Sequence, residues 1–121
     1  MRAAVLVAIA IPIFTSQLEK SRESVDLSNV RAAYAEVMTT VLTGDTSPDD
    51  SSIKYTASSK TWSKEVKPLK QSKDGWTTDM ATVEIGGVKY DANWDSVKAN
   101  GKCTISITSE GVATLTWGAA S

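Results

Sequence analysis

An uncharged apolar run near the N-terminus, continuous with a long helical pattern, constrains this chain more than any other feature. Residues 3–14 carry no charge, and Pro12 lies among them. One helix from about residue 3 to residue 42 would be roughly 60 Å long, at about 1.5 Å per residue. The remaining residues, 43–121, would form a globule only about 30 Å across. Such a globule covers about half of the helix, so the apolar half needs a bilayer, copies of itself or another protein's groove.

The apolar run is shorter than a complete membrane span, which needs about 20 apolar residues. Arg2 bounds it on one side and Glu19 on the other. We therefore interpret it as the C-terminal half of a span. A secretory signal peptide is the alternative, because Arg2 supplies a positive start and residues 3–11 an apolar segment of suitable length. Residues 12–14 are Pro-Ile-Phe, however, where a cleavage site needs small residues.

The second half of the helical pattern is amphipathic. From residue 27 onward, apolar residues recur at steps of three and four, which places them on one stripe. We expect this stripe to pack on the chain's own domain, with Val30, Tyr34, Val37 and Val41 making the contact between helix and sheet. The stripe consists of Leu27, Val30, Ala33, Tyr34, Val37, Met38, Val41 and Leu42.

Between residues 15 and 26 the apolar stripe is lost, and charged side chains are distributed around the helix. We predict a solvated connecting segment here. Oppositely charged pairs three or four residues apart would keep it helical, each contributing roughly 0.2–0.5 kcal/mol. The three pairs are Glu19 with Arg22, Lys20 with Glu23, and Arg22 with Asp26.

The helix is predicted to end at Gly44, because glycine readily takes the left-handed conformation that closes a helix. Beyond it the pattern changes to the two-residue period of strands. Residues 104–108 and 112–117 alternate and are separated by Ser-Glu-Gly, which predicts a hairpin. Residues 82–85 and 88–90 flank a Gly-Gly turn and predict a second hairpin. The economical arrangement is one four-stranded antiparallel sheet.

Two further segments of the C-terminal half carry weaker patterns. Residues 62–71 alternate poorly and contain Pro68, which fits an edge strand or an extended loop. Residues 91–100 are interpreted as a connection with room for one helical turn. The predicted fold class is α+β, a long N-terminal helix packed on a C-terminal antiparallel sheet. Residues 1–18 form its apolar helical segment and residues 19–121 a single globular domain.

Three stretches within the first third of the chain are distinctive. Residues 8–14 read AIAIPIF, residues 17–22 read QLEKSR, and residues 29–34 read NVRAAY. Together with the order of helix, loop and sheet, they resemble type IV pilins and pseudopilins. That family typically has an Ala-Ile-Pro step late in its membrane helix, followed by a charged stretch and an Arg-Ala-Ala-Tyr-like segment. Beyond Gly44 the resemblance is one of layout.

The resemblance implies a structural subunit of a pilus or pseudopilus filament, assembled through its apolar helix. Its implied partners are copies of itself and other pilins, with the membrane as its location before assembly and the cell surface afterwards. Pro12 is expected to kink the helix, the alternative being that it begins one. The assembly and membrane interface would comprise Ala8, Ile9, Ile11, Pro12, Ile13, Phe14 and Leu18.

The sequence departs from the family at its N-terminus. The prepilin motif, a glycine cleavage site followed by phenylalanine and a glutamate within the apolar run, has no counterpart before Ala3. We expect the sequence to begin part-way into the membrane helix. A different reading is a secreted or surface binding module from which the apolar segment is removed as a signal peptide. The sequence leaves open whether the chain is a major pilin, a minor pilin or a pseudopilin, and whether it serves adhesion, motility or DNA uptake.

Composition argues against an enzyme. The chain has no histidine, which is the commonest general base near neutral pH. It also lacks a glycine-rich phosphate loop and a His/Cys ligand cluster, although Ser-Lys chemistry and paired carboxylates stay open on paper. We predict no catalytic activity, no cofactor and no metal site. Cys103, the single cysteine, is expected to be a small buried hydrophobe.

Three other groups of residues have the chemistry to bind a ligand, but each also has a simpler structural role. Trp62, Trp76, Trp94 and Trp117 are expected to fill the core, although exposed ones could stack on sugars or bases. Two aspartate-rich clusters could offer oxygen ligands to calcium, but turn chemistry explains them without a metal. A run of lysines could attract DNA or an anionic surface, and a solvated edge is the reading we favour. The clusters are Asp45, Asp49 and Asp50, and Asp91, Asn93 and Asp95; the lysines are Lys54, Lys60, Lys64, Lys67, Lys70 and Lys73.

Overall fold

The long N-terminal helix, α1, spans Arg2–Thr43 in the computed structural model, which describes the backbone of residues 2–120 and the side chains of residues 17–120. It ends as predicted at Gly44, whose φ is +69°. The Gly44 amide donates to the Val41 carbonyl at 3.1 Å, and the Asp45 amide donates to the Thr40 carbonyl at 3.4 Å. These two bonds satisfy carbonyls that the helix end would otherwise leave unpaired.

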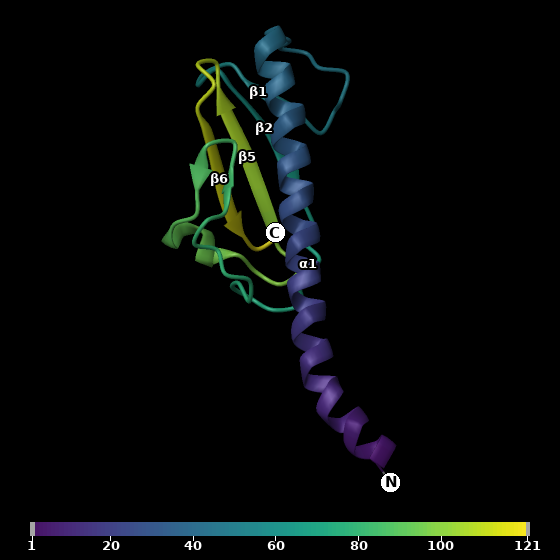
Figure 1. The fold of residues 1–121 in the computed structure, drawn as a ribbon. Coiled ribbons are helices and arrows are strands. Elements are labelled where there is room, and N and C mark those ends of the chain that lie inside the picture. The colour runs from purple at the N-terminus through teal and green to yellow at the C-terminus, as the bar shows by residue number, and fades with distance from the viewer. Residues whose placement is uncertain (1, 121) are drawn as a thin grey trace.

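A four-stranded antiparallel sheet forms the second layer, with the strand order β1-β2-β5-β6. Its strands are β1 (Lys54–Thr56), β2 (Thr61–Val66), β5 (Lys102–Thr108) and β6 (Ala113–Gly118). Two smaller elements lie between β2 and β5 in the chain, the hairpin β3 (Glu84–Ile85) with β4 (Val88–Lys89) and the 3-10 helix η1 (Ala92–Ser96). Helix α1 contacts β2 and β5, whereas η1 and β4 contact β6 (Figure 1).

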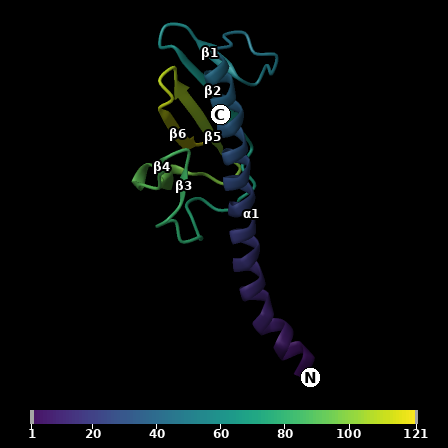
Figure 2. The same ribbon diagram turned by 45° about the horizontal axis from the view of Figure 1, so that its top comes forward.

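The core lies between the helix and one face of the sheet. Cys103, Ile105 and Ile107 of β5 are fully buried, while the residues between them are half-exposed on the opposite face. This alternation is the two-residue period from which the strand was predicted. Seen from a second direction, α1 still lies along the sheet and extends past the strands at its N-terminal end (Figure 2). The predicted α+β class, a long helix on an antiparallel sheet, is confirmed.

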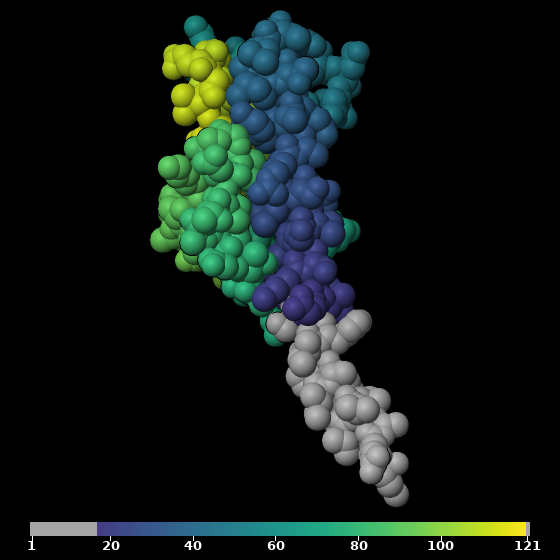
Figure 3. Space-filling model, viewed as in Figure 1, coloured from purple at the N-terminus to yellow at the C-terminus, as the bar shows by residue number. Residues whose placement is uncertain are grey.

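The predicted apolar stripe of α1 faces this core, with one exception. Val30, Val37 and Val41 are buried, and Tyr34 is half-buried against the core. Leu42 is 79% exposed, so its assignment to the stripe was wrong. Leu42 lies at the end of α1, where residues 42–47 are all exposed. The space-filling view shows the described part of α1 packed against later segments of the chain (Figure 3).

The two predicted hairpins both form, but they do not share a sheet. Strands β5 and β6 pair in the large sheet, whereas β3 and β4 make a separate two-stranded one. The small hairpin is pressed against the helix instead. A Cβ atom on Gly86 would come within 2.2 Å of the Tyr34 ring, so only glycine fits at that turn. The prediction that these two hairpins together make one four-stranded sheet was therefore wrong.

Strand β2 was predicted as an edge strand or loop, and it is an interior strand. It pairs with β1 on one side and with β5 on the other. Its alternation is obscured because Lys64 stands at an inward position, where its ammonium group pairs with Glu36 of α1. Pro68 lies beyond the end of the strand and removes no ladder hydrogen bond. The helical turn allowed within residues 91–100 is η1.

Candidate assembly helix and its attachment to the sheet domain

Most of the predicted assembly interface lies outside the side chains that the structure describes. This applies to residues 8–14, including the local geometry at Pro12. Because α1 begins at Arg2, the alternative in which Pro12 starts the helix is wrong. Leu18 is described and is 37% exposed. Within the part of the chain that the structure describes, no helix combines the length and the apolar character needed to cross a membrane.

The segment predicted to be solvated is instead attached to the domain along one face. Glu19, Glu23 and Asp26 are only 2%, 0% and 1% exposed. They are spaced by four and three residues, so they lie on one face of the helix. That face continues into the apolar stripe at Val30. We call these three acidic residues the carboxylate ladder; the prediction that they are distributed around a solvated rod was wrong.

The carboxylate ladder binds the backbone of one polar loop, residues 70–78. Glu23 accepts hydrogen bonds from the amides of Thr77 and Thr78, both at 2.8 Å, and from the Thr78 hydroxyl at 2.6 Å. Asp26 accepts from the amides of Lys70 at 2.6 Å and Gln71 at 3.0 Å. Bonds from neutral amides to buried carboxylates are charge-assisted and stronger than ordinary ones. Each carboxylate thus satisfies loop amides that no regular structure would pair.

Glu19 makes the rung nearest the apolar segment. It accepts hydrogen bonds from the Ser72 amide, from the Ser72 hydroxyl at 2.6 Å and from the Lys73 amide at 3.2 Å. Arg22 lies beside it, 3.5 Å from its carboxylate, and also donates to the Ser72 hydroxyl at 3.0 Å. Of the three predicted ion pairs, this is the one found among residues 17–120. The others are absent because Glu23 and Asp26 point inward to the loop.

The two ends of the carboxylate ladder have opposite pKa shifts. Burial works to raise the pKa of Glu19, but the hydrogen bonds from Ser72, Lys73 and Arg22 outweigh it, so the pKa is lowered. Burial raises the pKa of Asp26, and the amide bonds from the loop offset it only in part. Glu19 therefore contributes stability above its unfolded pKa that is lost as the pH falls through its folded pKa. The contribution of Asp26 is present below its unfolded pKa and is lost as the pH rises.

The loop is held equally well on its other side, so it joins the helix to the sheet domain. Gln71 is fully buried, and its side-chain amide donates to the carbonyls of Lys73 and Gly75 at 3.0 and 2.8 Å. The Gly75 amide donates to the Val97 carbonyl, and the Trp76 indole donates to the Trp94 carbonyl at 2.9 Å. The described helix from Glu19 onward is thus fixed in direction relative to the sheet.

The tryptophans supply core area, as predicted. Trp62, Trp94 and Trp117 are buried, and Trp76 is half-buried against the same core. The ring of Trp117 lies between two others, with ring centroids 5.1 Å from Trp76 and 5.3 Å from Trp94. These contacts place the indoles in the core of the described part of the chain. Cys103 is also buried, and burial raises the pKa of its thiol to about 12.

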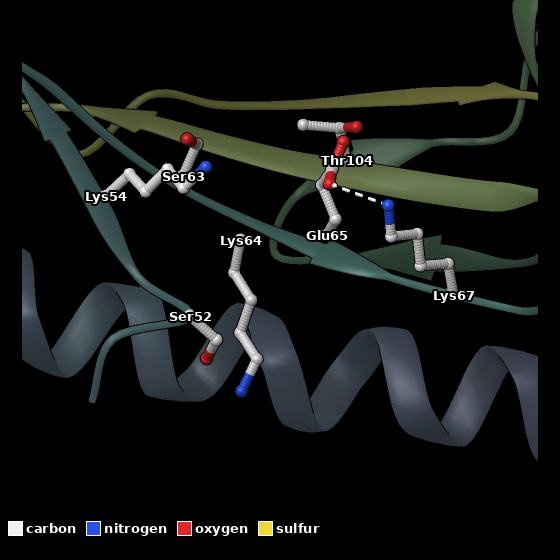
Figure 4. A pocket seen from close by; sticks show the side chains of 7 residues that line it. All are labelled: Ser52, Lys54, Ser63, Lys64, Glu65, Lys67 and Thr104. Atoms are coloured by element: carbon white, nitrogen blue, oxygen red, sulfur yellow. Dashed lines mark ion pairs between the residues drawn. The ribbon is translucent and has the colours of Figure 1, made fainter. Parts of the chain in front are cut away.

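A shallow depression of about 330 Å³ lies over β2 and β5 and includes part of the lysine run (Figure 4). Its positive charge is largely balanced. Lys64 points from β2 toward the helix and pairs with Glu36 and Asp50, and Lys67 lies 3.6 Å from Glu65. Two of the three lysines that line the depression are thus paired with carboxylates, which weakens its attraction for an anion. For the lysine run as a whole, a solvated edge stays the prediction, with DNA binding as its alternative.

The aspartate clusters serve turns in the structure. Asp91 caps η1 by accepting from the Asn93 amide at 2.9 Å, and Asp45 accepts from the Ser47 amide at the same distance. Among the residues that the structure describes, no group of His, Cys, Asp or Glu side chains could hold a metal ion. Turn chemistry accounts for the placement of Asp45, Asp50 and Asp91.

Comparison with protein-family models, with curated proteins and with solved structures finds no match for this chain.

Proposed function

We propose that this protein is a structural subunit of a type IV pilus or related pseudopilus filament, assembled through its apolar N-terminal helix. One observation carries the proposal. Helix α1 spans 42 residues, and among the side chains described, those of residues 17–120, the first that bonds it to the domain is that of Glu19. The residues ahead of that point, 3–14, are uncharged and apolar in sequence. A helix of this kind requires apolar contacts from outside its own domain.

Filament assembly supplies such contacts. Apolar helices of successive copies can bundle through head-to-tail contacts. Where such contacts do not form a closed ring, each added copy extends the assembly, which gives a fibre with the sheet domains outside. Before assembly the same segment would reside in the membrane, and in the filament its partners would be further copies and other pilins at the cell surface. Chemistry on substrates has no part in this role, and we propose neither a cofactor nor a catalytic centre.

The carboxylate ladder has a specific task in this proposal. Copies can only stack regularly if each presents its apolar segment at the same angle to its domain. Glu19 is bonded to Ser72 only five residues after Phe14, so the attachment reaches close to the proposed assembly segment. A loose helix would lose conformational entropy at each addition, whereas a fixed one has already lost it on folding.

The decisive experiment is N-terminal sequencing with intact-mass measurement of the protein recovered from the native cell surface. We expect a mature chain that retains residues 3–14 and is found in sheared filaments. A mature chain that begins after Phe14 would overturn the proposal. It would favour a secreted binding module whose apolar segment is a signal peptide.

A second experiment uses two exposed leucines on the same helix. Leu18 lies next to the apolar segment and Leu42 at the far end, and both are exposed in the isolated chain. In filaments carrying Leu18→Cys, we expect slow labelling by a thiol reagent because neighbouring helices cover that position. Leu42→Cys is the matched control and should label at the same rate before and after assembly. Equal labelling of both variants in filaments would contradict assembly through the N-terminal segment.

A further inference from the structure

Strand β6 is an edge strand whose outer side has no partner in the described part of the chain. The sheet order places β6 last, next to β5 only. Its sequence, Ala-Thr-Leu-Thr-Trp-Gly, contains no charge and no proline. Natural proteins usually protect long edge strands with charges, proline, bulges or a covering segment. The opposite edge follows that rule, since β1 has only three residues and includes Lys54. Segments η1 and β4 contact β6 but do not pair with it, so within the described residues the outer backbone of β6 has no strand partner.

The register shows which backbone groups are unpaired at that edge. The Thr108 amide donates to the Val112 carbonyl at 3.0 Å, which makes this the first hydrogen-bonded pair of the β5–β6 hairpin. Hydrogen-bonded and non-hydrogen-bonded pairs alternate along an antiparallel ladder. Within β6, Ala113, Leu115 and Trp117 therefore direct their N–H and C=O groups away from β5.

These groups lie open to a groove. A groove of about 270 Å³ runs between β6 and η1, lined by Asn93, Ser96 and residues 114–117. The side chains of Leu115 and Trp117 point into the core and are nearly fully buried. What these two residues present to the groove is therefore their backbone. Of the residues that the structure describes, none forms a hydrogen bond with these outward backbone groups.

We propose that β6 is an interaction surface for a second copy of this chain, whose own β6 pairs with it antiparallel in a two-fold symmetric contact. With Leu115 opposite Leu115 of the other copy, Ala113 stands opposite Trp117 of that copy. The outward N–H and C=O groups of these residues then all find partners. On the exposed face, Thr114 of each copy meets Thr116 of the other, a favourable cross-strand pair. This contact does not depend on the filament proposal.

Three observations favour a second β6 over other strands. Two uncharged segments bring no like charges opposite one another. Because the outward residues are 113, 115 and 117 in both copies, the symmetric register matches every group. Pairing with β1 of another copy would involve only three residues and would bring Lys54 to the interface. A two-fold contact also closes on itself, so it links copies in pairs and does not extend a fibre.

The register can be tested by disulfide cross-linking of the full chain in a mild non-ionic detergent, which shields the apolar segment. Two single variants, Thr114→Cys and Thr116→Cys, are oxidised separately and as a mixture. In the proposed register these positions form a non-hydrogen-bonded pair, about 4.5 Å apart at Cα, which suits a disulfide. Like positions lie on the diagonal at about 7–8 Å, which is too far. Cys103 is buried and does not compete.

We expect cross-linked dimers in the mixture and a loss of nearly all of them in each separate sample. Adding Ala113→Pro to both variants should abolish the product, because it removes an outward N–H that the β5 ladder does not use. Equal cross-linking in separate and mixed samples, or none in the mixture, would overturn the proposal. Cross-linking of Thr56→Cys with Thr116→Cys would instead assign the partner strand to β1. Unchanged far-ultraviolet circular dichroism checks that each variant folds.

Discussion

Replacing Glu23 by glutamine tests whether the carboxylate ladder holds the fold together. Glutamine has the size and nearly the helix propensity of glutamate, so the change isolates the charge and one acceptor oxygen. The retained oxygen can still accept from the amide and hydroxyl of Thr78. The new side-chain NH2 then faces the N–H of Thr77, so two donor groups point at each other and neither has an acceptor. Losing one charge-assisted bond costs about 1.5–3 kcal/mol, and unpaired buried donors add to that.

We therefore expect Glu23→Gln to lower the free energy of unfolding by about 2–4 kcal/mol. Urea denaturation of the full chain in mild detergent measures it, and the midpoint should fall by roughly 1–2 M. The matched control is Glu36→Gln on the same helix. Glu36 is exposed and pairs with Lys64, so its loss should cost less than about 1 kcal/mol.

Hydrogen exchange gives the local readout. In Glu23→Gln, the amides of Thr77 and Thr78 should exchange faster by a larger factor than the amides of β5, because the loop opens before the sheet does. The reasoning would be refuted if Glu23→Gln were no more destabilising than Glu36→Gln and the two loop amides kept their protection. Such a result would mean that the loop is held mainly by its contacts with the sheet domain.

Three further results are expected. Between pH 7 and pH 3, Glu19→Gln should lose less stability than the unmodified chain, because the lowered pKa of Glu19 makes its contribution disappear as the pH falls. Asp26→Asn should lose more, because the raised pKa of Asp26 makes its contribution grow as the pH falls. Urea midpoints at each pH measure both effects. Gly86→Ala should lower the free energy of unfolding by about 2 kcal/mol more than Gly87→Ala. Both glycines have a positive φ, so the backbone strain is shared, but only a Cβ atom at residue 86 would collide with the Tyr34 ring of α1. Equal effects would place the ring elsewhere. Cys103 should react with a thiol reagent only at the rate of unfolding, since it is fully buried and its pKa is raised to about 12; rapid labelling of the folded chain would contradict its burial.

Periodicity predicted those parts of the fold in which one residue type repeats on one face. The β5–β6 hairpin follows from strict alternation, and the end of α1 follows from Gly44. Strand β2 was missed because Lys64 occupies an inward position that a pattern rule assigns to an apolar residue. Its partner, Glu36, lies on the helix, and no local pattern reveals such a long-range pair. Tertiary contacts of this kind override single-strand propensity.

The carboxylate ladder was missed for a related reason, although its spacing was visible. Residues 19, 23 and 26 are spaced by four and three, and a further step of four leads to Val30 of the apolar stripe. The periodicity of the buried face is therefore unbroken from Glu19 to Val41, and only its chemistry changes. A search restricted to apolar residues ends the face at Leu27. Extending the search to acidic residues would have found it, given a later loop with many unpaired amides.

This change of chemistry explains how one continuous helix can bind two different surfaces. C-terminal to Leu27, the helix faces a sheet whose backbone N–H and C=O groups are already paired, so apolar side chains are the appropriate contact. N-terminal to Leu27, the helix faces the loop of residues 70–78, whose backbone amides are not paired in a sheet. Apolar side chains there would leave those amides buried and without acceptors. Carboxylates solve that problem and at the same time keep the lower half of the helix from being apolar on every side. The run of α1 that is apolar on every side in sequence therefore lies before Gln17, where the filament proposal needs it.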